Sequence, residues 1–195
     1  MLLVETLATN HGQASAQPFG AVAFRGATWD LSHLAPFAFK MDVGQGLEVS
    51  VFVLFSCHCF TKSFRWDPRP SLMIPDHEIY VDEHERRVLC EQRYNLSRQF
   101  LREIVTNLES RRITLADDRR PNFVTLEHVD EASGQTLLYA VFFEVERDKS
   151  RKRLILRVQS AYVLEEGLTK RQRHAKKIAL ATLLRNVQKG KPVRA

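Results

Sequence analysis

The residues with the clearest chemical potential lie together at the end of an apolar run, where Cys57 and Cys59 flank His58. Two thiols beside an imidazole are typical of three arrangements: a metal-binding turn, a nucleophile next to its base, or the end of a buried strand. Each arrangement implies a different kind of protein. The secondary structure expected around these three residues therefore distinguishes the three arrangements.

The run from 47 to 60 is expected to form one long strand that makes a hairpin with residues 37–41. Side chains alternate between the two faces of a strand, so Cys57 and Cys59 would continue the apolar face while His58 points the other way. A zinc site needs ligands that converge. We therefore predict no metal and no cofactor here, and interpret both thiols as buried core residues.

The imidazole of His58 is a candidate catalytic group. It ends a long apolar strand, and Ser56 would project from the same face. A histidine in such a place can act as a general acid or base. The alternative, a histidine that only bonds a backbone carbonyl at the end of the strand, is more common in proteins.

A second candidate site lies where another apolar strand becomes polar, at Arg157, Ser160 and Tyr162. Alternation predicts that Ser160 and Tyr162 share a face and that Arg157 lies on the other. Arginine can stabilise phosphoryl charge, and hydroxyl groups can orient a substrate or donate a proton. The alternative is purely structural, with Arg157 paired to Glu144 across the sheet and Tyr162 in the core.

Charge is distributed unevenly along the chain. Residues 168–195 hold nine Lys or Arg and no Asp or Glu, whereas the other residues hold 20 basic and 23 acidic groups. This asymmetry favours a polyanionic partner, RNA before DNA, or an acidic protein partner or inhibitor. A solvated helix face is the alternative. The candidate nucleic-acid-binding residues are Lys170, Arg171, Arg173, Lys176, Lys177 and Arg185.

Length and composition predict one cytoplasmic domain over residues 1–195, with a loosely held arm at 1–20 and a basic helix and tail at 168–195. Three cysteines, an odd number, suit a reducing compartment better than a disulfide framework. No apolar run approaches the roughly 18 residues that span a bilayer, so no membrane partner is expected.

The periodicity predicts an α+β fold. The expected sheet is antiparallel, made of the N-terminal hairpin and a C-terminal meander of three strands, and it packs against two or more α-helices. The expected elements are helices at 96–109 and 170–187 and meander strands at 123–129, 137–146 and 154–163.

A helix followed by a three-strand meander that ends in Gln159, Ser160, Ala161 and Tyr162 resembles the bacterial ribonuclease toxins, a group with barnase, EndoU, RelE and the colicin tRNases. The resemblance covers about residues 95–165. It implies metal-independent RNA cleavage by a toxin or phage-defence effector, with Arg157, Ser160 and Tyr162 at the site. His58, outside that range, is the candidate base. The alternative function is a non-catalytic binding module, such as an adaptor, regulator or antitoxin-like protein.

Overall fold

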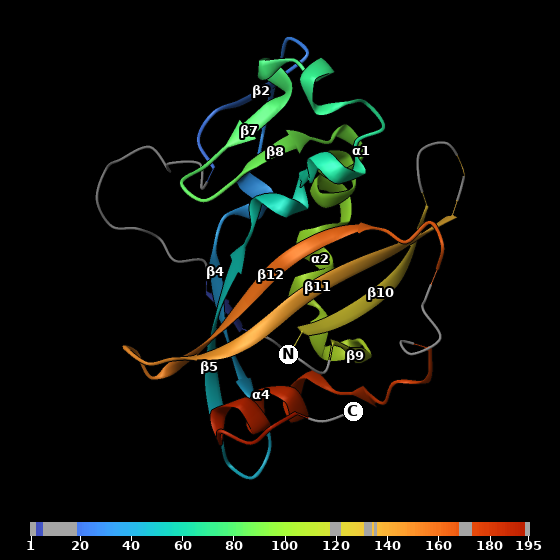
Figure 1. Ribbon diagram of the computed structural model, residues 1–195. Coiled ribbons are helices and arrows are strands. Elements are labelled where there is room, and N and C mark those ends of the chain that lie inside the picture. The colour runs from blue at the N-terminus through green and yellow to red at the C-terminus, as the bar shows by residue number, and fades with distance from the viewer. Residues whose placement is uncertain are drawn as a thin grey trace.

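The computed structural model describes residues 3–5, 19–117, 122–130, 134, 136–167 and 173–193. A curled sheet of eight strands dominates it, in the order β1-β4-β5-β12-β11-β10-β9-β13 (Figure 1). The strands are β1 Leu3–Glu5, β4 Phe37–Asp42, β5 Glu48–Phe55, β9 Ile113–Asp117, β10 Asn122–Asp130, β11 Thr136–Asp148, β12 Arg153–Val163 and β13 Lys177–Ile178. Two small sheets pair β2 (Val22–Phe24) with β3 (Ala27–Trp29), and β8 (Arg86–Leu89) with β6 (Thr61–Lys62) and β7 (Ile79–Val81).

The predicted antiparallel sheet is wrong, because the main sheet is mixed. The β4–β5 hairpin and the β10–β11–β12 meander are both present and antiparallel. They are joined by β5 and β12, which run parallel, with Val51 opposite Leu154 and Phe55 opposite Val158. Short polar connections in the sequence reveal hairpins, but nothing local indicates a pairing between strands so far apart in the chain.

The predicted α+β class with two or more helices on the sheet is also wrong, since the described part of the chain is mostly β with one long helix. That helix covers residues 91–106 and consists of α1 (Glu91–Leu96), a π-helical turn (Ser97–Leu101) and α2 (Arg102–Thr106). The other helices of the described residues are α4 (Leu180–Gln188) and short stretches of one or two turns. Figure 1 shows the long helix behind β11 and β12.

The core lies between the long helix and the inner face of the sheet. Alternate residues of β5 are buried, and the same period holds along β4 and, up to Val158, along β12. The helix contributes Leu96, Leu101 and Ile104 to this core at helical spacing. The outer face of the sheet has a much smaller apolar cluster around Val124 and Phe142.

The C-terminal helix begins later than predicted. Residues 177 and 178 form β13, which pairs with β9, so α4 starts only at Leu180. Leu180, Leu183 and Leu184 are completely buried and anchor the helix to the same core. No helix of the described residues is long and apolar enough to cross a lipid bilayer.

Candidate functional site

The strand that leads to His58 ends earlier than predicted. β5 stops at Phe55, and Cys57–Cys59 form a 3₁₀ turn, so the alternation of faces does not extend to the imidazole. The Ser56 hydroxyl accepts a hydrogen bond from the His58 N–H at 3.1 Å and donates one to the Gln159 carbonyl at 2.7 Å. This cap holds the turn against β12. The argument that Cys57 and His58 must diverge is therefore wrong.

The turn brings two side chains to one carboxylate. His58 Nε2 lies 2.5 Å from Glu85 Oε1, and Cys57 Sγ lies 3.5 Å from the same oxygen. Cys57 Sγ is also 3.5 Å from Asp82 Oδ2. Cys57 is buried, but the side chains of His58 and Glu85 are 33% and 34% exposed. Cys59 is fully buried in the core, as predicted.

Asp82 and Glu85 are held by the turn between β7 and β8. Asp82 Oδ1 accepts hydrogen bonds from two N–H groups of this turn, at 2.8 and 2.9 Å. Glu85 Oε2 accepts one from Arg87 Nη1 at 3.1 Å. Burial alone would raise the pKa of Glu85, but the hydrogen bonds from His58 and Arg87 outweigh it and lower this pKa. Sequence reasoning missed Glu85, because no motif links it to a histidine 27 residues away.

The buried thiol of Cys57 is a poor nucleophile in this setting. Burial, together with the neighbouring negative charges of Glu85 and Asp82, raises the pKa of Cys57 far above that of a free cysteine. A reactive cysteine needs the opposite environment, in which nearby positive charge stabilises the thiolate. Of the arrangements considered for this element, a cysteine nucleophile is therefore the least suited to the geometry.

Arg93 lies between the His58 turn and the second predicted site. Its Nη1 donates to the carbonyl oxygens of His58 and Thr61, at 3.2 and 2.8 Å. Its guanidinium lies 4.7 Å over the ring of Tyr162, which stacks on Phe142. Burial lowers the pKa of Arg93 and raises that of Tyr162. The two predicted sites are therefore neighbours, connected through Arg93.

A bulge changes the faces of β12. The pairing with β11 shifts at Gln159, which places one extra residue in β12. Ala161, and not Ser160, continues the buried face that contains Val158. Ser160 and Tyr162 are half-buried and still share a face, but not the face of the apolar residues before the bulge. The prediction that alternation continues unbroken through Tyr162 is wrong.

Arg157 takes the structural role that was considered as an alternative. Its Nε lies 3.4 Å from Glu144 Oε1, and its Nη2 lies 3.8 Å from Glu146 Oε1. Both glutamates are on the neighbouring strand, β11. Two carboxylates therefore compete with any phosphate for this guanidinium.

The predicted nucleic-acid-binding residues differ from one another in their surroundings. Lys170 and Arg171 lie outside the described residues. Arg173, Lys176 and Lys177 are exposed, and no carboxylate of the described residues forms an ion pair with them. Arg185 donates from Nη1 to the Val43 carbonyl at 2.8 Å and thereby ties α4 to the β4–β5 turn.

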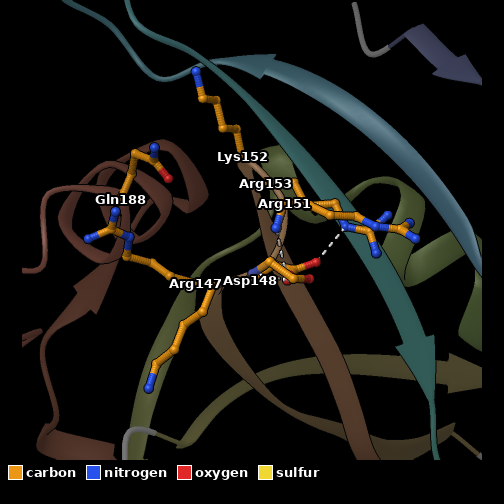
Figure 2. A pocket seen from close by; sticks show the side chains of 8 residues that line it. Arg147, Asp148, Arg151, Lys152, Arg153 and Gln188 are labelled. Carbon is orange, nitrogen blue, oxygen red and sulfur yellow. Dashed lines mark hydrogen bonds and ion pairs between the residues drawn. The ribbon is translucent and has the colours of Figure 1, made fainter.

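An open pocket of about 670 Å³ lies at the tip of the β11–β12 hairpin and is lined by residues 147–153 and by Gln188 of α4. Five of those seven hairpin residues are Lys or Arg. The single carboxylate, Asp148, is already bound by Arg153 at 2.9 Å (Figure 2). We call residues 147–153, with Arg185, Lys189 and Lys191, the basic end. Sequence reasoning treated residues 147–153 only as a connection, although their charge density was a visible signal.

Comparison with known proteins identifies the family of this chain. A model of the YjaZ family matches residues 21–188. Protein YjaZ of Escherichia coli (strain K12) is 31% identical over 165 residues, which cover 83% of this chain and 85% of that protein. No solved structure matches the chain. These matches do not test the resemblance to ribonuclease toxins, which stays a prediction. Since the family model covers the His58 turn, the hairpin and α4, this chain belongs to the YjaZ family.

Proposed function

We propose that this protein binds single-stranded RNA at its basic end and acts as a non-catalytic regulator or adaptor in the cytoplasm. The observation that carries the proposal is the cationic pocket between the β11–β12 hairpin and α4. The basic end contains eight Lys or Arg and one carboxylate, Asp148. Such a local excess of cations attracts phosphate groups regardless of sequence.

Most of these cations are free to meet phosphate. Lys149, Arg151 and Lys152 are exposed, and none forms an ion pair with a carboxylate of the described residues. Only Arg153 is committed within the hairpin, to Asp148 and to the ring of Phe52, 4.3 Å away. Free lysines and arginines can release the counterions of RNA, which is the main source of affinity in non-specific complexes.

The shape of the basic end favours a single strand. The five cations of the hairpin line the pocket at its tip, and Gln188 of α4 lines the other side (Figure 2). A flexible strand can bend its phosphates around such a tip, whereas a stiff duplex needs a longer continuous track of contacts. An acidic protein partner is the competing ligand for the same surface.

RNA cleavage by a toxin or phage-defence effector stays a prediction. The pairing of His58 with Glu85 favours it, because a carboxylate can orient an imidazole that acts as a general base. Against it, Arg157 already faces two glutamates, and the Tyr162 ring already contacts the Arg93 guanidinium and the Phe142 ring. Binding without cleavage therefore agrees better with the geometry.

The test is fluorescence anisotropy with a labelled single-stranded RNA in EDTA, followed by a denaturing gel of the same samples. We expect the wild type, His58→Ala and Tyr162→Phe to bind equally and to leave the RNA intact. We expect the triple variant Lys149→Ala, Arg151→Ala, Lys152→Ala to bind weakly.

Each other result has a clear meaning. If the wild type does not bind RNA at low salt, the proposal is wrong. Tighter binding of duplex DNA than of RNA would contradict the preference for a single strand. Cleavage that disappears in His58→Ala would instead support the nuclease hypothesis.

A further inference from the structure

Three side-chain atoms that can bind a metal converge beside the 3₁₀ turn after β5. They are Cys57 Sγ, His58 Nε2 and Glu85 Oε1, and they lie within 4.8 Å of one another. One sulfur, one imidazole nitrogen and one carboxylate oxygen form a donor set that suits Zn²⁺.

The spacing of the sulfur and the Glu85 oxygen agrees with a tetrahedral ion. With Zn–S near 2.3 Å and Zn–O near 2.1 Å, tetrahedral S and O ligands stand about 3.6 Å apart. Cys57 Sγ is 3.5 Å from Glu85 Oε1. The imidazole of His58 is closer, 2.5 Å from Glu85 Oε1, so this partly exposed ring would move back by about 1 Å to bind the same ion.

The charges around the thiol show that the cluster lacks a cation. Cys57 has one proton to donate, yet two carboxylate oxygens, from Glu85 and Asp82, lie 3.5 Å from its sulfur. The Cys57 thiolate and the Glu85 carboxylate would neutralise a bound divalent cation. Asp82 adds one negative charge beside the sulfur, and Arg87, whose Nη1 is 3.1 Å from Glu85 Oε2, balances it.

Surrounding hydrogen bonds already hold the donors in place. The Ser56 cap fixes the turn that carries Cys57 and His58. The Thr61 hydroxyl donates to the Cys57 carbonyl at 2.8 Å and accepts from Arg87 Nε at 2.7 Å. Such an outer layer of hydrogen bonds is typical of metal centres, where it orients the ligands.

We propose that Cys57, His58 and Glu85 bind a zinc ion, with water as the fourth ligand, and that this ion fastens the turn after β5 to the β7–β8 hairpin. The ion has a structural role, and its partly exposed histidine and glutamate ligands give it a path from solvent. This inference does not depend on RNA binding, which involves other residues.

The test is a titration of metal-free protein with Co²⁺, which replaces zinc and reports its ligands by absorption. We expect one equivalent of Co²⁺ to produce the sulfur-to-metal charge-transfer band and the visible bands of tetrahedral cobalt. Cys57→Ala should abolish the charge-transfer band. Glu85→Gln and His58→Ala keep the thiol, and we expect them to weaken binding by about tenfold or more. Zn²⁺ should raise the melting temperature of the wild type and not that of Cys57→Ala.

Cys90→Ala is the matched control, because this partly buried thiol precedes α1 and is not part of the cluster. It should retain the full cobalt spectrum. The proposal is overturned if the wild type gives no charge-transfer band, if the band survives in Cys57→Ala, or if Cys90→Ala loses it. Should circular dichroism show that Cys57→Ala is unfolded, unchanged cobalt affinity in both Glu85→Gln and His58→Ala would overturn the proposal instead.

Discussion

Removing three cations from the basic end should change the salt dependence of RNA binding by a predictable amount. The change is Lys149→Ala, Arg151→Ala and Lys152→Ala in one protein. These side chains are exposed and contact no carboxylate of the described residues, so their loss should leave the fold intact. Arg153 is kept, because it holds Asp148 at the base of the turn.

The magnitude comes from counterion release. For single strands, each neutralised phosphate contributes about 0.7 to the slope of log K against log salt concentration. If each of the three cations meets one phosphate, the slope falls by about 2. If the wild type and the variant have the same binding constant at 1 M salt, the variant binds RNA about 100-fold more weakly at 0.1 M salt.

The assay is fluorescence anisotropy with the same RNA over a series of salt concentrations. The control variant removes three exposed arginines elsewhere, by Arg65→Ala, Arg86→Ala and Arg98→Ala. It therefore has the same net charge as the hairpin variant. It should keep the wild-type slope. If both triple variants lose the same slope, RNA responds only to net charge, and the assignment to the basic end is refuted. An unchanged slope in the hairpin variant would refute it as well.

Three further predictions concern stability. The Tyr139 hydroxyl is buried without a hydrogen-bond partner among the described residues. Tyr139→Phe should therefore raise the free energy of unfolding, measured by urea denaturation, by about 1 kcal/mol. A large decrease in this free energy would contradict the prediction. Leu184→Ala should cost about 2–5 kcal/mol, because this side chain of α4 is completely buried, whereas Thr182→Ala on the same helix should change little. Burial lowers the pKa of His33 to about 4, well below the 6.5 of an unfolded chain, so the unfolded state takes up a proton first as the pH falls. Stability should therefore decrease between pH 6.5 and 4, and His33→Gln, which can still bond Ser97, should reduce that decrease; an identical pH profile in both proteins would contradict the reasoning.

Elements that depend on local pattern were predictable. The β4–β5 hairpin and the meander follow from alternating apolar residues joined by short polar turns. The long helix was expected at 96–109 and lies at 91–106, because its apolar period is clear but its ends are not. The bulge at Gln159 was not predictable, since one inserted residue leaves the composition of the strand unchanged.

The sequence alone determined which side chains are available for function: the thiols and imidazole at 57–59, and the dense cations between β11 and β12 and around α4. Only the tertiary structure decided which of them meet. The parallel contact of β5 with β12 ends β5 beside Gln159, and the 3₁₀ turn there directs Cys57 and His58 toward Glu85. Periodicity reports which face of an element is buried, but it contains no information about partners that packing of the core brings together from distant parts of the chain.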